Sequence, residues 1–221
     1  MATDHTIARR NMIDGQLRPN GVLSEELLQV LANLPRERFV PAERRAVAYS
    51  DEAVPLGGGR YLVEPMLLAR MLQLLQPTGD DTALVVGAGT GYAAVALGRL
   101  VRAVVALECE PRLAAEARAA ASALSVANVE VVEGPLAAGV PAKGPYSLIL
   151  VDGAVPAIPE ALIGQLADQG RLAAVVAGEV PGRIGQMRLG RKAHGVFSSR
   201  AIFDAGSPLL PGFEKPRAFV F

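Results

Sequence analysis

The sequence contains one cysteine, Cys109, no tryptophan and only two histidines in 221 residues. A single cysteine excludes a disulfide framework within the chain and any zinc site built from several cysteines. His5 and His194 are the only imidazole ligands, and isolated histidines of this kind are more often surface residues, so we expect no metal. The sequence also has no excess of positive or negative charge, because its 22 basic and 22 acidic side chains give a formal net charge of +0. A protein that binds nucleic acid through its phosphates would show a basic excess, so we expect no nucleic-acid partner.

Long apolar runs are also missing. The longest stretch without charge, residues 82–98, is interrupted by four glycines and lacks the continuous apolar character of a membrane span. The first 19 residues contain no apolar core of a secretory signal. We therefore expect a cytoplasmic protein with no membrane segment. Its length allows one large domain, or one domain with an appendage.

Residues 1–60 predict helices and irregular loops and show no strand pattern. Ser24 is a good helix N-cap, followed by two glutamates and a stripe of leucines that stops at Pro35. A second helix is predicted to begin at Pro65 and to stop at Pro77. We interpret residues 1–79 as an N-terminal helical extension.

From residue 80 onward, short apolar runs alternate with alanine-rich helical segments. The runs cover residues 82–87, 103–108, 128–134, 147–153 and 170–178. Strands that are apolar on both faces and separated by helices are typical of a parallel sheet covered on both sides. Residues 80–221 are therefore predicted to form a doubly wound α/β domain. After residue 182, the pieces IGQMRL, FSSRAIFD and RAFVF resemble closing strands, with short turns that suit antiparallel pairing.

The sharpest local signal is a glycine loop, VVGAGTGY, in which Gly87, Gly89 and Gly91 follow the first predicted strand of this domain and open a helix. Glycine lets the chain turn tightly and lets a ligand approach the backbone. Glu108 ends the next strand, about 20 residues after the first glycine, where a carboxylate can accept both hydroxyls of an adenosine ribose.

The glycine loop alone does not decide which ligand binds there. A dinucleotide fingerprint needs a glycine where Tyr92 stands, which favours S-adenosylmethionine over NAD and makes a nucleotide-dependent oxidoreductase the weaker alternative. A phosphate-binding P-loop is excluded because no Gly-Lys-Ser/Thr follows. The glycines could also form only a tight strand-to-helix turn.

With these segments in view, the sequence resembles the protein-L-isoaspartate O-methyltransferase family over roughly residues 10–180. The matching segments are PRERFVPAERRAVAYSDEAVPLGGGR, EPMLLARML, VVGAGTGY, VVALE, NVEVVEG, LILVDGA and PEALIGQLADQGRLAAVVAG, in this order. The resemblance implies a Rossmann-like methyltransferase fold, S-adenosyl-L-methionine as cofactor, and methylation of isoaspartyl carboxyl groups in damaged proteins. It further implies a cofactor site formed by Gly87, Ala88, Gly89, Thr90, Gly91, Glu108 and Gly134.

Three positions depart from the family pattern. Val85 stands where an acidic residue usually precedes the first glycine, and Pro135 replaces an aspartate that reaches the adenine. Val63 replaces the serine regarded as catalytic in the family. Two alternatives to isoaspartate methylation therefore stay open, namely a methyltransferase with another acceptor and a non-catalytic homologue that binds S-adenosylmethionine.

Glu64 and Asp152 are the two candidate catalytic residues. Glu64 would either activate a hydroxyl or amine acceptor or simply complement the helix N-terminus that follows it. Asp152 is predicted at the carboxyl end of a strand, where open α/β sheets bind their ligands, and would act as a base, bind a substrate amine or cap the turn after it. The C-terminal residues 203–221 are expected either to cover the cofactor pocket as a lid or to pack as a final edge strand.

Overall fold

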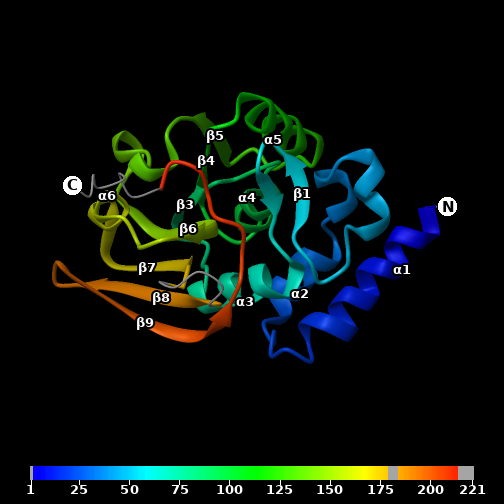
Figure 1. Ribbon diagram of the computed structural model, residues 1–221, viewed down its shortest axis with the longest axis horizontal. Helices are drawn as coiled ribbons and strands as arrows, with labels where there is room; N and C mark the ends of the chain where they lie inside the picture. The colour runs from blue at the N-terminus through cyan, green and yellow to red at the C-terminus, as the bar shows by residue number, and fades with distance from the viewer. Residues whose placement is uncertain (1, 179–183, 214–221) are drawn as a thin grey trace, which may run out of the picture.

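A seven-stranded sheet in the order β5-β4-β3-β6-β7-β8-β9 forms the centre of the protein (Figure 1). The structure is a computed structural model that describes residues 2–178 and 184–213. Five strands are parallel: β3 (Thr82–Val86), β4 (Ala103–Glu108), β5 (Val129–Glu133), β6 (Tyr146–Val155) and β7 (Leu166–Val176). Two antiparallel strands, β8 (Gly185–Ala193) and β9 (Val196–Ala205), extend one edge. The prediction of a mostly parallel sheet closed by antiparallel strands is confirmed for IGQMRL and FSSRAIFD, whereas RAFVF lies outside the described residues.

Both faces of the sheet are covered because its strands are apolar on both sides. Along β3, Ala83 and Val85 join one buried cluster, and Leu84 and Val86 join the other. The first cluster includes residues of α3 (Pro65–Leu75), α4 (Tyr92–Gly98) and α5 (Pro111–Ala123). The second includes Leu162 of α6 (Glu160–Gly164) and residues near the short turns η4 (Leu136–Ala138) and η5 (Pro141–Lys143). This arrangement is the predicted doubly wound, Rossmann-like fold.

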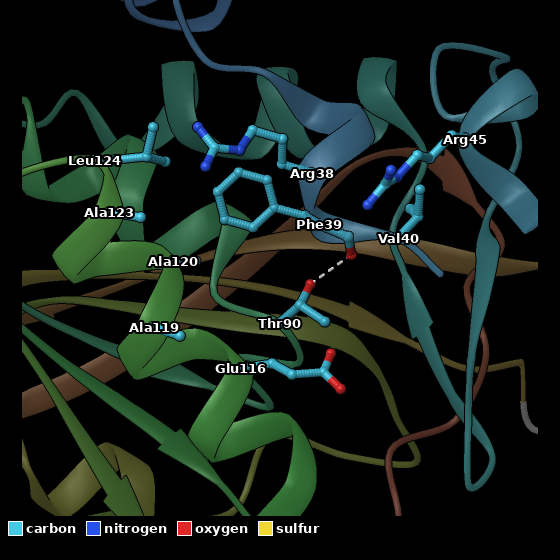
Figure 2. A pocket seen from close by; sticks show the side chains of 10 residues that line it. All are labelled: Arg38, Phe39, Val40, Arg45, Thr90, Glu116, Ala119, Ala120, Ala123 and Leu124. Atoms are coloured by element: carbon cyan, nitrogen blue, oxygen red, sulfur yellow. Dashed lines mark hydrogen bonds between the residues drawn. The ribbon is translucent and has the colours of Figure 1, made fainter. Parts of the chain in front are cut away.

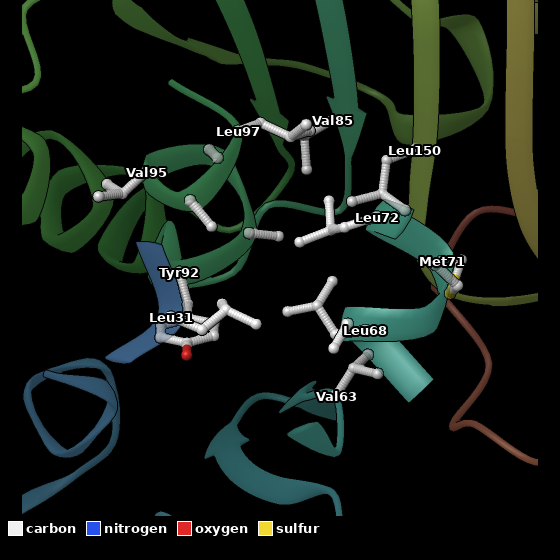
Figure 3. Close-up of a cluster of buried hydrophobic side chains, with 14 of the residues drawn as sticks. Leu31, Val63, Leu68, Met71, Leu72, Val85, Tyr92, Val95, Leu97 and Leu150 are labelled. Carbon is white, nitrogen blue, oxygen red and sulfur yellow. The ribbon is translucent and has the colours of Figure 1, made fainter. Parts of the chain in front are cut away.

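The N-terminal part folds against the first of these faces. Its helices are α1 (Ala2–Met12), the π-helical turn η1 (Ile13–Leu17), α2 (Glu25–Ala32) and the 3₁₀ turns η2 (Arg36–Phe39) and η3 (Ala42–Val47). The predicted N-cap is present, because the Ser24 hydroxyl accepts a hydrogen bond from the Leu27 N–H at 3.3 Å. Figure 3 shows Leu31 and Leu68 in the same cluster as Val85 and Leu150 of the sheet. Residues before and after position 80 thus share one core, and a domain boundary there stays a prediction.

A short hairpin corrects the sequence analysis, which found no strand pattern in residues 1–60. Strand β1 (Val54–Gly57) pairs antiparallel with β2 (Arg60–Leu62). Strands of three and four residues are too short to show an alternating pattern, which explains why the sequence did not reveal them. Gly57, Gly58 and Gly59 all have positive φ and turn the chain tightly between the strands. The hairpin places Arg60 beside the glycine loop.

No helix within residues 2–178 and 184–213 is long and apolar enough to cross a membrane.

Candidate cofactor site

The glycine loop connects β3 to α4 at the carboxyl edge of the parallel sheet. Gly87, Gly89 and Gly91 have φ values of +80°, +55° and +93°, a region that side chains other than glycine rarely adopt. The N–H groups of Gly87 and Ala88 both donate to the Leu107 oxygen, at 2.9 and 3.0 Å, and so fasten the loop to the end of β4. The predicted strand–loop–helix setting of the loop is therefore present.

Glu108 lies at the end of β4, next to this loop, and its side chain is fully buried. Its carboxylate accepts hydrogen bonds from the N–H groups of Gly89, Cys109 and Glu110, at 2.6, 2.9 and 3.1 Å. Gly134, which follows β5, donates its N–H to the Glu108 main-chain oxygen at 3.1 Å. The structure thus brings together Glu108, Gly134 and the glycine loop, as predicted.

Arg60 is a site residue that the sequence analysis missed. Its Nη2 lies 3.0 Å from Glu108 Oε2 and 2.8 Å from the Gly87 oxygen, and its Nε lies 3.3 Å from Glu108 Oε1. Both side chains of this ion pair are buried, at 3% and 0% exposure. Burial alone would raise the pKa of Glu108, but the Arg60 guanidinium and the main-chain N–H groups outweigh it and hold that pKa below its usual value. An arginine after three glycines gives no sequence signal for this contact, because its partner is 48 residues away.

Thr90, which the sequence predicted as part of the cofactor site, bonds through its side chain to the N-terminal part of the chain. Its hydroxyl donates to the main-chain oxygen of Phe39 at 2.7 Å. In Figure 2 this bond lies at a separate pocket of about 370 Å³, which Arg38, Arg45 and Glu116 also line. The Thr90 side chain therefore ties the loop to the N-terminal part of the chain, and its place in the cofactor site stays a prediction.

Asp152 lies in β6, which continues to Val155, so the predicted strand end at residue 153 is wrong. The pairing of β6 with β3 does stop at Val151, and the register shifts between Leu150 and Ala154. Gly153, with φ of +152°, lies within this irregular part and lets the strand resume beyond it. Asp152 is consequently the first residue past the β3 pairing, beside the carboxyl edge of that strand.

Asp152 is buried, and some of the polar atoms around it lack a hydrogen bond. Asp152 lines a small cavity with Arg60, Val63 and Ser207, and neither Asp152 Oδ1 nor Ser207 Oγ has a hydrogen-bond partner. Burial raises the pKa of Asp152 to about 7, against the opposing influence of the Arg60 and Arg36 cations. A carboxyl group that titrates near neutral pH can exchange a proton with a ligand under physiological conditions.

Val63 and Glu64, which precede α3, have different surroundings. Val63 lines the Asp152 cavity, and its oxygen accepts a hydrogen bond from Arg36 Nη2 at 2.6 Å. Glu64 occupies the N-cap position of α3, but its side chain makes no capping hydrogen bond. Burial raises the pKa of Glu64 above its usual value. The lining of the cavity includes Asp152 and does not include Glu64.

The residues of the site suit an adenosine and methionine ligand, but this chain's own side chains fill part of the space. A Cβ atom added to Gly87 would lie 2.8 Å from Leu210 Cδ2 and 3.0 Å from Arg60 Nη2. Leu210 is held there because the segment around it pairs with β6: the Ala154 N–H donates to the Pro208 oxygen at 3.0 Å, and the Leu210 N–H donates to the Ala154 oxygen at 2.8 Å. The described part of the C-terminal segment thus lies over the glycine loop. Within residues 2–178 and 184–213, no group of three or more His, Cys, Asp or Glu side chains is suited to a metal ion.

Comparison with known proteins gives one family. The family model of protein-L-isoaspartate(D-aspartate) O-methyltransferase matches residues 8–200. A protein-L-isoaspartate O-methyltransferase of Methanoregula boonei is 41% identical over 170 residues, which cover 77% of this chain and 78% of the relative. One of Roseiflexus castenholzii is 42% identical over 175 residues, covering 79% and 80%.

Solved structures show the same fold. A protein-L-isoaspartate O-methyltransferase superposes with a TM-score of 0.80 at 23% identity, over 93% of this chain and 67% of the other. A second, from Plasmodium falciparum in complex with S-adenosyl-L-homocysteine, gives a TM-score of 0.76 at 17% identity, over 94% and 98%. With the sequence matches, these findings confirm the predicted fold, enzyme class and cofactor, since the family consists of S-adenosylmethionine-dependent methyltransferases. The chain belongs to the protein-L-isoaspartate(D-aspartate) O-methyltransferase family.

Proposed function

We propose that this chain methylates the carboxyl group of isoaspartyl residues in proteins or peptides, with S-adenosyl-L-methionine as methyl donor. The observation that carries the proposal is the glycine loop facing a buried Glu108 at the carboxyl edge of the parallel sheet. In this proposal Gly87, Ala88, Gly89, Gly91, Glu108 and Gly134 hold the cofactor, with Thr90 contributing through its main chain. The protein acts in the cytoplasm.

Methylation of a carboxylate needs no proton transfer by the protein. When bound, the cofactor supplies an electrophilic methyl group on its sulfonium sulfur. An acceptor carboxylate is already ionised at neutral pH, so the protein has to align it and exclude water. Val63 and Asp152 line a cavity of only about 10 Å³, so in this proposal the side chains around it move to admit the acceptor carboxylate. Replacement of the family's serine by Val63 removes one orienting hydroxyl and leaves the displacement itself feasible.

Asp152 favours a second candidate function, methylation of a hydroxyl or amine acceptor. A carboxyl group with a pKa of about 7 is suited to act as a general base for such an acceptor. Glu64 is the weaker candidate for this role because it does not line the cavity.

Methyl transfer to two matched peptides tests both functions. We expect labelled S-adenosylmethionine to methylate an isoaspartyl peptide and not its aspartyl isomer, and the Glu108→Ala variant to lose the activity. Label that enters neither peptide but enters proteins of a cell extract, in a Glu108-dependent way, would support the second candidate. A chain that binds S-adenosylhomocysteine and transfers no label at all would instead be a non-catalytic homologue.

A further inference from the structure

The Glu108 carboxylate has no remaining capacity for a ligand. Its two oxygens accept from Arg60 Nε and Nη2, from the N–H groups of Gly89, Cys109 and Glu110, and from the Cys109 thiol at 3.5 Å. A carboxylate offers about four acceptor positions, so these six donors saturate it. Two ribose hydroxyls can therefore bind Glu108 only if an existing donor leaves.

Arg60 is the donor that can leave. Three of the six donors are main-chain N–H groups of the glycine loop and of the end of β4, whose positions are set by the fold. The Cys109 thiol is a weak donor at 3.5 Å, so its departure alone releases little. Arg60 reaches Glu108 with a long side chain from the β1–β2 hairpin, and the same Nη2 lies close above Gly87. Moving this one guanidinium frees acceptor positions on Glu108 and also opens space over the glycine loop.

A displaced Arg60 still needs a negatively charged partner, because a buried cation without one is strongly disfavoured. Arg60 already lines the cavity that contains Val63 and Asp152. In the proposed function the acceptor carboxylate enters here, and because the cavity is only about 10 Å³, its lining has to widen to admit the group. The carboxylate would be the counter-ion for Arg60 there, and the cation would offset the repulsion from nearby acidic groups.

We propose that Arg60 and the cofactor ribose compete for Glu108, and that cofactor binding moves the Arg60 guanidinium toward the Asp152 cavity, where it binds the acceptor carboxylate. Arg60 is then a specificity-determining residue that makes acceptor binding depend on prior cofactor binding. The second part of this inference rests on the proposed function, whereas the competition for Glu108 does not.

Calorimetric titration with S-adenosylhomocysteine tests the competition. We expect Arg60→Gln to bind it at least about fivefold more tightly than the wild type, within the usual range of site coupling. Glu108→Gln should bind it more weakly. Arg18→Gln serves as a matched control, since Arg18 forms an exposed ion pair with Glu25 in the N-terminal part of the chain, and should leave the affinity unchanged. Equal or weaker binding by Arg60→Gln would overturn the competition.

A measurement on the wild type covers the case in which Arg60→Gln does not fold. The side-chain Nε–H of Arg60 donates to Glu108, so its ¹⁵N resonance, assigned by its loss in Arg60→Lys, should shift when S-adenosylhomocysteine is added. A resonance that keeps its position at saturating ligand would show that Arg60 stays on Glu108.

Peptide titration tests the second part. We expect an isoaspartyl peptide to bind the wild type at least about fivefold more tightly when S-adenosylhomocysteine is present, and this dependence to disappear in Arg60→Gln. Equal affinity with and without the ligand would overturn the acceptor role of Arg60. A peptide that binds in neither state would overturn both that role and the proposed acceptor, while the calorimetric result would still decide the competition for Glu108.

Discussion

The hydroxyl of Thr90 donates a hydrogen bond to the main-chain oxygen of Phe39, 51 residues earlier in the chain, and both residues are buried. One residue of the glycine loop is therefore fixed to the N-terminal part. The contact joins the segment that contains Phe39 to the glycine loop, which belongs to the proposed cofactor site.

Replacing Thr90 by valine should lower the free energy of unfolding by about 1–3 kcal/mol, since it leaves a buried oxygen without this donor. Urea denaturation measures the change. Thr82→Val is a suitable control, because Thr82 bonds the Ser147 hydroxyl through its main-chain N–H and oxygen. Equal stability of the two variants would show that the Thr90–Phe39 bond contributes nothing net.

Gly91→Ala should destabilise the protein by about 1–3 kcal/mol, because alanine is strained at a positive φ and its Cβ would crowd Ala117. Gly91 has φ of +93°, and its Cβ would lie 3.0 Å from Ala117 Cβ and 3.1 Å from Ala117 Cα on α5. Gly15→Ala is the contrasting variant, because its Cβ would meet nothing within 4 Å at an exposed helical position. Thermal unfolding of both variants should show a loss for Gly91→Ala alone.

Asp81 and Arg171 form a partly buried ion pair in which Arg171 Nη2 lies 2.9 and 2.8 Å from the two Asp81 oxygens. Burial would raise the pKa of Asp81, but hydrogen bonds from Ser147 and Thr78 and the Arg171 cation together hold it below its usual value. A lowered pKa stabilises the fold above the unfolded-state pKa, and this contribution is lost as the pH falls through the folded-state pKa.

At pH 7 the wild type should therefore be more stable than Asp81→Asn, and the difference should shrink once the pH falls below about 4. Urea titrations at several pH values provide the comparison. The neighbouring Asp80→Asn, at an exposed position, should not show this convergence. A difference that is constant with pH would contradict the role given to the Asp81 charge.

Asp152 should produce the opposite pH dependence. Its pKa of about 7 lies above that of an unfolded aspartate, so the folded state disfavours the charged form, and stability is lost as the pH rises from the unfolded-state pKa, about 4, to 7. Asp152→Asn, which resembles the protonated acid, should match the wild type near pH 4 and exceed it by about 2–4 kcal/mol at pH 8. The exposed Asp204→Asn should show no such gain. If Asp152→Asn is less stable than the wild type at pH 8, burial does not disfavour the charged Asp152 in the folded state.

The sequence alone predicted the regular elements well where the pattern was long. The apolar runs before Gly87 and Glu108 correspond to β3 and β4, and the helices after Ser24 and Pro65 begin where their capping residues predict. The sequence failed on features that depend on distant contacts. Three such features leave no pattern in the nearby sequence. They are the β1–β2 hairpin, the continuation of β6 past Asp152, and the hydrogen bond from Thr90 to Phe39.

The sequence by itself determined the fold class and the position of the glycine loop and Glu108, because these follow from periodicity, spacing and glycine backbone freedom within short segments. The family followed from the resemblance of an ordered set of segments to known sequences. Only the tertiary structure decided what the Glu108 carboxylate contacts. Its partner Arg60 comes from a hairpin 48 residues earlier, and a buried ion pair between such distant residues forms only when packing removes both from water. The same packing raises the pKa of Asp152 beside it. Tertiary packing therefore decided the ion pair and the pKa values of this site, whereas the order of residues decided its strands and glycine loop.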